Sequence, residues 1–143
     1  MKTKNLLKDI LGKWNFPVLK ETDTSLVFRY QMNFIQANLN NDDDMDTVSL
    51  TLAGVFTAEN DEEMFLCLRA CNELNFSIFH VKLYIDADAD LVIASEFFYN
   101  DEKNLENLFK SGLDVMLVSK KKFLEKYREL EDEAKLISEL EKE

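Results

Sequence analysis

Apolar and polar residues alternate with a period of two in residues 47–58. Val48, Leu50 and Leu52 fall on one side of this pattern, and hydroxyl-bearing residues fall on the other. Side chains along a strand point alternately to opposite faces, so the pattern predicts an antiparallel strand with one face in the core and one face in water.

A second run with strand character covers residues 25–39, but its period changes near Asn33. Alternating apolar residues precede that point, whereas Phe34 and Ile35 are adjacent. Two interpretations fit the pattern, one bent strand or a tight hairpin. The polar segment 38–46, with three consecutive aspartates at its centre, predicts an exposed loop before the next strand.

Two further alternating runs, residues 77–85 and 91–99, flank the short acidic segment 86–90. Two runs of this kind joined by a short polar turn predict a β-hairpin.

Three segments repeat apolar residues at the spacing of a helix. The first covers residues 4–14, the second opens at Asn60, and the third runs from Asn104 to the end of the chain. Asn60 is placed as an N-cap, with Glu63 in position for a capping box. The second helix is almost entirely apolar, so we expect it to be the most buried. The third is close to 40 residues long, or about 60 Å.

Together these elements predict an α+β protein in which an antiparallel sheet of about five strands is flanked by helices. The predicted order is α-β-β-β-α-β-β-α, ending in a long C-terminal helix. We expect residues 1–125 to form a single domain. Residues 126–143 continue the last helix as a partly exposed extension, because their apolar stripe is narrow and their charges are mixed.

Composition and charge restrict the classes of partner. Of the 143 residues 46% are hydrophobic, which suits a packed core, and the net charge is −11. Negative charge repels phosphate backbones and anionic lipid, so we expect no nucleic acid and no membrane partner. The N-terminus lacks the apolar segment of a signal peptide, and the two cysteines are expected to be reduced thiols. Both features favour a cytoplasmic protein.

The acidic turn has the D-x-D-x-D spacing that begins a calcium-binding loop. Such a loop also needs glycine at its sixth position and glutamate at its twelfth, where this chain has Leu91 and Phe97. The pattern therefore favours a hairpin turn over a metal site, since aspartate tolerates turn geometry.

Cys67 and Cys71 are spaced to share one face of a helix, but His80 is the one histidine that can join them. Zinc usually takes four ligands, so two buried thiols are the favoured interpretation. The chain also lacks a glycine-rich phosphate loop and a nucleophile elbow. We predict no catalytic residue, no metal and no cofactor.

The motifs CNELN at residues 71–75, VKLYID at 81–86 and LVI at 91–93 occur in the predicted order of helix, strand, acidic turn and strand. In this respect the chain resembles the YbjN-like family, which is labelled as bacterial sensory-transduction regulators and is similar in fold to type III secretion chaperones. The resemblance covers most of residues 1–125. It departs at the turn, where the family usually has Asp-Gly, and in the longer helical tail.

This resemblance implies a non-enzymatic binding or chaperone-like module, often dimeric. We hypothesise that the protein is a homodimer that captures a protein or peptide partner on an exposed apolar or edge-strand surface. The aromatic residues predicted to form the contact surface are Phe28, Tyr30, Phe97 and Phe98.

Two alternatives remain at the level of sequence. The first is a structural or oligomerisation module that acts through the long C-terminal helix. The second is a metal-dependent enzyme, with ligands drawn from Asp86, Asp88, Asp90 and Glu96.

Overall fold

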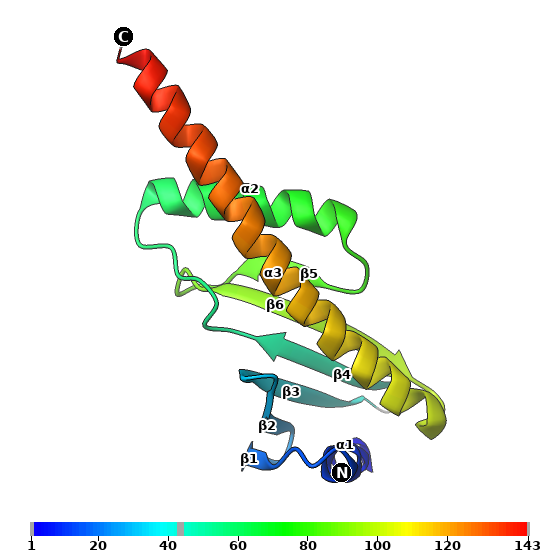
Figure 1. Ribbon diagram of the computed structural model, residues 1–143. Helices are drawn as coiled ribbons and strands as arrows, with labels where there is room; N and C mark the ends of the chain where they lie inside the picture. The colour runs from blue at the N-terminus through cyan, green and yellow to red at the C-terminus, as the bar shows by residue number, and fades with distance from the viewer. Residues whose placement is uncertain (1, 43–44, 143) are drawn as a thin grey trace.

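The computed structural model of the protein describes residues 2–42 and 45–142. These residues form a six-stranded antiparallel sheet with three helices, and the strand order is β1-β2-β3-β4-β6-β5 (Figure 1). The elements in chain order are α1 (Lys2–Lys13), β1 (Val18–Glu21), β2 (Ser25–Tyr30), β3 (Asn33–Asp42), β4 (Met45–Leu52), α2 (Asp61–Ser77), β5 (Lys82–Ile85), β6 (Leu91–Tyr99) and α3 (Glu102–Glu141).

The predicted α+β class and the order of its elements are confirmed, with one strand more than expected. The additional strand is β1, which is short and mostly exposed and therefore carries no alternating apolar signal. None of the helices in the described residues combines the length and apolar character needed to cross a membrane.

Residues 25–39 form a tight hairpin, which decides between the two interpretations left open by the sequence. β2 and β3 are joined by Gln31 and Met32, both of which have positive φ, 46° and 66°. The predicted loop at residues 38–46 is wrong for the described part of that segment. There β3 extends to Asp42 and β4 begins at Met45, while Asp43 and Asp44 lie outside the described residues.

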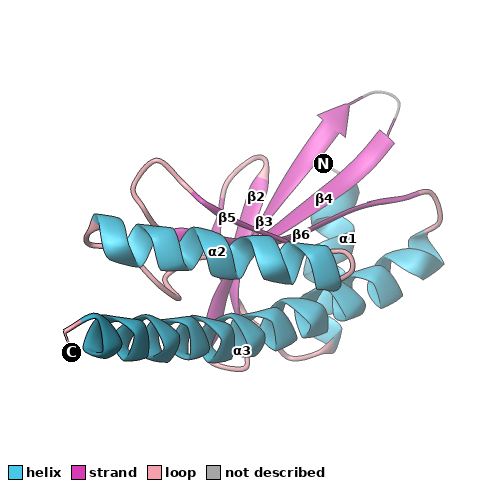
Figure 2. Ribbon diagram, turned by 90° about the horizontal axis from the view of Figure 1, so that it is seen from above, coloured by secondary structure: helices cyan, strands magenta, loops and turns pink. Residues whose placement is uncertain are grey.

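One face of the sheet, here called the inner face, is covered by helices (Figure 2). α3 packs across β6, and α2 lies against both β5 and α3. The inner face carries the buried apolar residues of the central strands, which are Leu26, Phe28, Ile35, Ala37, Val48, Leu50, Leu52, Leu91 and Ile93. Burying this set removes a large apolar area from water and is the main source of folding free energy.

α3 contributes its own buried stripe to this core: Leu105, Phe109, Leu113, Met116, Phe123 and Leu130. At Gly112 the helix comes so close to the sheet that a Cβ atom would lie 3.0 Å from Ser95 Oγ and 3.3 Å from Leu50 Cδ1. The absence of a side chain at Gly112 therefore allows α3 and β6 to approach each other.

Asn60 caps the N-terminus of α2 as predicted, but Glu63 does not complete the capping box, because its side chain bonds the residue before Asn60. The Asn60 side chain accepts a hydrogen bond from the Glu63 N–H at 2.8 Å, and the Glu63 side chain accepts one from the Glu59 N–H at 3.1 Å. Burial of α2 is confined to one face, however, and Phe65 and Phe76 on this helix are exposed. Apolar composition alone therefore overstated how much of α2 is buried.

The β5–β6 turn places Ala89 at a φ of 62°, a conformation that costs an alanine about 1–2 kcal/mol. We predict that Ala89→Gly raises the free energy of unfolding by about 0.5–1 kcal/mol, after allowing for the greater freedom of glycine in the unfolded chain. Chemical denaturation measured by circular dichroism gives this difference. Ala87→Gly is the matched control, because Ala87 lies in the same turn without positive φ, and we expect it to lower stability. Equal effects of the two substitutions would contradict the prediction.

Candidate peptide-binding edge

The second half of β6 has a free edge. β6 lies between β4 and β5, and it pairs with β4 along residues 93–99. β5 is shorter and pairs only with residues 91–94. Among the described residues, no strand pairs with residues 95–99 on the β5 side of the sheet. We call this segment the β6 edge.

Two hydrogen bonds identify the backbone groups that face the β6 edge. The Asp86 N–H donates to the Asp90 carbonyl at 3.0 Å on the β5 side, and the Leu91 N–H donates to the Phe56 carbonyl at 2.9 Å on the opposite side. Successive residues of a strand direct their N–H and C=O groups to opposite edges. Even-numbered residues of β6 therefore face β5, and the groups left without a strand partner belong to Glu96 and Phe98.

The free edge exists because the chain enters β5 late. The sequence predicted a strand over residues 77–85, but α2 continues to Ser77 and β5 begins only at Lys82. Between them His80 has a φ of 61°, and within the described residues the connection from α2 pairs with no strand before Lys82. Residues 95–99 are therefore left without a strand on this side.

The outer edge of β5 is closed by a side chain. Asn75 on α2 donates from Nδ2 to the Leu83 carbonyl at 2.9 Å and accepts from the Leu83 N–H at 2.8 Å on Oδ1. The amide of Asn75 thereby makes the two hydrogen bonds that a neighbouring strand would make. β5 is consequently protected from further pairing, and the β6 edge is the accessible one on this side of the sheet.

A cavity of about 230 Å³ adjoins the β6 edge on the inner side. Ser95 and Phe97 of β6 form one wall, and the floor is formed by α3 residues Leu108, Ser111, Gly112 and Val115. Ser95 is buried, yet its hydroxyl makes no hydrogen bond to any other described residue. The cavity lining is mainly apolar, and its polar members are Ser95, Ser111, His80 and Glu96.

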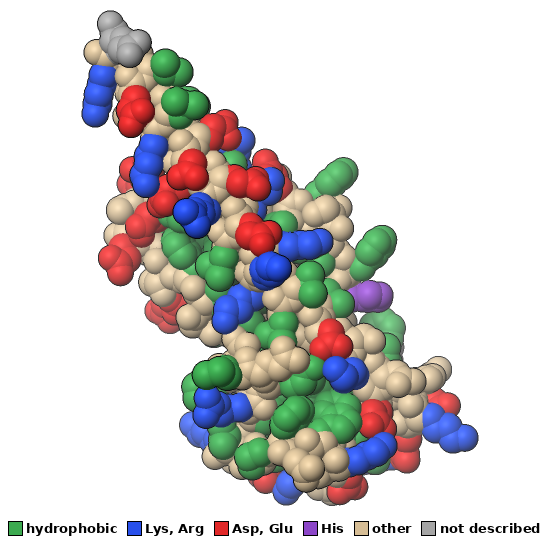
Figure 3. Space-filling view, in the orientation of Figure 1, with side chains coloured by type: hydrophobic (Ala, Val, Ile, Leu, Met, Phe, Trp, Pro, Cys, Tyr) green, Lys and Arg blue, Asp and Glu red, His purple; other side chains and the backbone are tan. Residues whose placement is uncertain are grey.

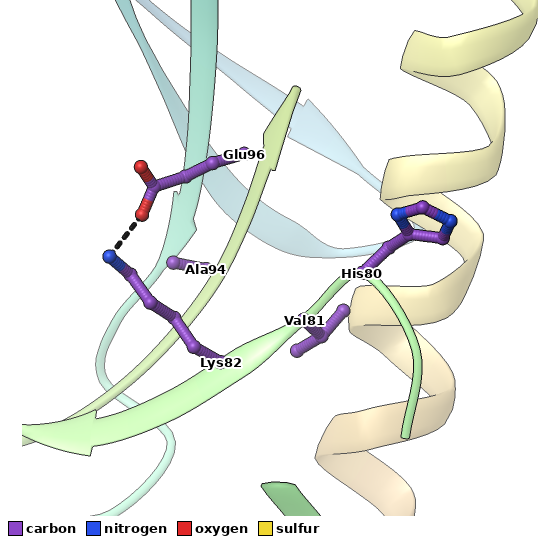
Figure 4. Close-up of a pocket in the computed structure, with 5 residues that line it drawn as sticks. All are labelled: His80, Val81, Lys82, Ala94 and Glu96. Carbon is purple, nitrogen blue, oxygen red and sulfur yellow. Dashed lines mark ion pairs between the residues drawn. The ribbon is translucent and has the colours of Figure 1, made fainter. Parts of the chain in front are cut away.

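A shallower depression of about 350 Å³ continues from the cavity around His80. Figure 4 shows Lys82 and Glu96 pointing toward one another as an ion pair, while His80 points toward α3. The hydrogen bond to Glu96 raises the pKa of Lys82. The two charges beside the β6 edge therefore compensate each other. In Figure 3 exposed apolar side chains gather around the histidine.

Two of the four predicted contact residues lie at this edge. Phe98 is 66% exposed on the outer face, and Phe97 lines the cavity on the inner face. The other two are in the core and do not form an exposed contact surface. Phe28 is fully buried and packs edge-on against Phe109 at a centroid distance of 5.6 Å.

Tyr30 is 3% exposed and also lies away from the β6 edge. Its hydroxyl donates to Asp114 Oδ1 at 2.6 Å and accepts from Lys110 Nζ at 3.0 Å. Burial, and then the hydrogen bond to Asp114, raise the pKa of Tyr30. The residue joins β2 to α3 rather than presenting a surface to a partner.

The acidic turn is explained by its own hydrogen bonds. Asp86 Oδ1 accepts from the N–H groups of Asp88 at 2.9 Å and Asp90 at 3.1 Å. The Asp90 carboxylate accepts from the Thr57 hydroxyl. Oxygen atoms of the three aspartates lie within 4.8 Å of one another, and this proximity follows from the turn geometry. Glu96, the fourth residue of the metal hypothesis, pairs with Lys82 instead.

Cys67 and Cys71 are free thiols buried on α2, as the sequence favoured. A hydrogen bond between the two thiols and burial raise the pKa of Cys71. A thiol held in its neutral form is a poor nucleophile.

Comparison with known proteins shows which solved structures share the fold of this chain. No protein-family model and no curated protein matches the sequence. The crystal structure of YbjN from E. coli matches with a TM-score of 0.58 and 12% identity, over 85% of this chain and 88% of that chain. This likeness confirms the predicted resemblance at the level of fold: the chain has a YbjN-like fold.

Two further solved structures are similar at lower scores. One is the Yersinia pestis type III secretion chaperone SycH in complex with a stable fragment of YscM2, with a TM-score of 0.49 and 9% identity over 80% of this chain and 96% of that chain. The other is an uncharacterized protein from Methanothermobacter thermautotrophicus, with a TM-score of 0.47 and 17% identity over 84% and 98%.

We predict that Asn75→Ala lowers the free energy of unfolding by about 1–2 kcal/mol relative to a matched control, because the Leu83 backbone loses both side-chain partners. The control is Asn72→Ala, which gains the same helix propensity on the same helix but whose exposed side chain makes no hydrogen bond to a described residue. Denaturant titration of both variants checks the difference. If the two were equally stable, the Asn75–Leu83 pairing would not contribute as described.

Proposed function

We propose that this protein is a non-enzymatic protein-binding module that captures an extended segment of a partner polypeptide at the β6 edge. The supporting observation is the pair of residues Glu96 and Phe98, whose backbone donors and acceptors have no strand partner on the β5 side within residues 2–42 and 45–142. Peptides commonly bind folded domains by adding a strand to an edge of this kind.

Side chains of the captured segment would alternate between the two sides of the sheet. On the inner side, the cavity floored by Leu108 and Val115 accepts one apolar side chain beside Phe97. On the outer side, the exposed ring of Phe98 offers a second apolar contact. Backbone pairing supplies affinity in this mode, and the side-chain pockets supply sequence preference.

Electrostatics restrict the partner further. The Lys82–Glu96 pair leaves no excess charge at the β6 edge, but the protein as a whole carries a net charge of −11. An acidic segment would be repelled at long range, and a neutral or basic segment would not. We propose a neutral or basic, β-prone segment as the partner, in the cytoplasm, where the two thiols remain reduced.

The same edge also admits a second copy of the chain, since two β6 edges related by a twofold axis pair in antiparallel fashion. The homodimer expected from the sequence would then be a continuous sheet across two copies. Sizing of the free protein by light scattering distinguishes this arrangement from an edge that is open to a peptide.

We predict that Phe98→Pro weakens peptide binding at least about tenfold relative to Phe98→Thr. Both substitutions remove the aromatic ring, but only proline removes the N–H at the β6 edge, a position where the fold tolerates it. Peptides are first selected from a phage-displayed library of random linear sequences on the unmodified protein. Their affinities for the two variants are then compared by fluorescence anisotropy.

Hydrogen exchange provides an independent readout on the unmodified protein. Bound peptide should slow exchange at the amides of Glu96 and Phe98 more than at the flanking amides of β6, which already pair with β4. Selected peptides that bind both variants equally, or a library that yields no binder, would overturn the proposal.

A further inference from the structure

A second apolar groove lies between the N-terminal half of α2 and the C-terminal end of α3, with a volume of about 260 Å³. Phe65 and Leu66 form one wall, and Leu130, Ala134 and Ile137 form the other. We call it the α2–α3 groove. Leu66 and Leu130 are buried at its base, whereas Phe65 and Ile137 are 64% and 48% exposed at its rim.

Both walls carry their groove-lining residues at helical spacing. On α3 these are positions 130, 133, 134, 137, 138 and 141, and on α2 they are positions 62, 65, 66 and 69. The α3 wall thus extends over about 16 Å, or three turns. Figure 1 shows the end of α3 projecting past α2.

The rim of the α2–α3 groove is acidic. It includes Glu62, Glu133 and Glu141, and none of these carboxylates forms an ion pair with a described residue. The one cationic residue of the rim, Arg69, is directed to Glu73 at 4.0 Å.

Tyr127 of α3 has a pKa that is raised to about 12, first by burial and then by the carboxylates of Glu63 and Glu131. Of the three rim carboxylates, Glu62 makes a small contribution to this shift.

We propose that the α2–α3 groove binds a basic amphipathic helix of a partner protein. Unlike the β6 edge, the groove has walls that are both helical, with backbone groups already hydrogen-bonded within each helix. An occupant must therefore be held through side chains while satisfying its own backbone, as a helix does. Apolar residues at a three- and four-residue spacing would fill the groove, and flanking lysine or arginine would pair with Glu62, Glu133 and Glu141.

Charge distinguishes this occupant from a second copy of the chain. Each copy carries a net charge of −11, and the helices that it would insert, α2 and the end of α3, bear carboxylates along their exposed faces. Pairing two such surfaces places like charges together, which is unfavourable. A cationic helix makes favourable contacts at the same rim.

The test uses a fluorescein-labelled helical peptide of about 14 residues, with leucines on one face and lysines on the other. We expect it to bind the full chain in fluorescence anisotropy, with an affinity that falls steeply as salt is raised. Two control peptides are used. One replaces every lysine by glutamate, and the other keeps the composition but scrambles the leucine spacing. Both should bind at least about tenfold more weakly.

Three variants locate the binding site. Phe65→Ser and Ile137→Ser should each weaken binding of the basic peptide at least about fivefold. Phe76→Ser is the matched control, because Phe76 is on α2, is 95% exposed and does not line the groove, and it should leave the affinity unchanged. All three residues are exposed, so thermal denaturation should show the variants to be folded.

Equal weakening by all three variants, or equal binding of the lysine and glutamate peptides, would overturn this inference. So would a dimer in light scattering that Phe65→Ser dissociates, because the occupant would then be a second copy. Phe98→Pro should leave binding of the helical peptide intact. Failure at the α2–α3 groove is thereby separated from failure at the β6 edge.

Discussion

The apolar stripe of α3 lies across the inner face of the sheet and continues beyond it onto α2. Phe109 and Leu113 pack over the central strands, whereas Phe123 and Leu130 reach the region of α2. Gly112 sets how close the helix comes to β6. Because one helix contacts both the sheet and the second helix, the position of α3 determines which sheet face is buried and where α2 lies.

That arrangement covers the sheet on one face only and leaves two kinds of surface open. The first is the β6 edge, which results from the unequal lengths of β5 and β6. The second is the α2–α3 groove, which results from two helices that touch and then diverge. They differ in what they offer a ligand, backbone groups in one case and apolar side chains with carboxylates in the other. The two proposed partner segments are therefore chemically different.

Elements marked by local signals were predictable from the sequence. The cap at Asn60, the acidic turn of the β5–β6 hairpin and the apolar stripe of α3 each depend on residues close together in the chain. β1 was missed because its residues are mostly exposed and do not alternate. The turn at Gln31 and Met32 was ambiguous because such turns are usually marked by asparagine and glycine.

The candidate site was only partly predictable, for a physical reason. Alternation shows which residues share a face of a strand, but the choice of buried face depends on where α3 packs. Phe28 and Phe98 have similar local patterns, and one is in the core while the other is exposed. The free edge itself arises because α2 continues to Ser77 and β5 begins only at Lys82, which alternation of apolar residues does not reveal.

α3 also has a thermodynamic consequence of its own. It is one continuous helix that floors the cavity at Val115 and walls the groove at Leu130, about 22 Å apart along its axis. Suppose that a ligand in the cavity shifts this helix and thereby changes the affinity of the groove for its own ligand. A ligand in the groove must then change the affinity of the cavity by the same factor, because the coupling free energy between two binding equilibria is reciprocal.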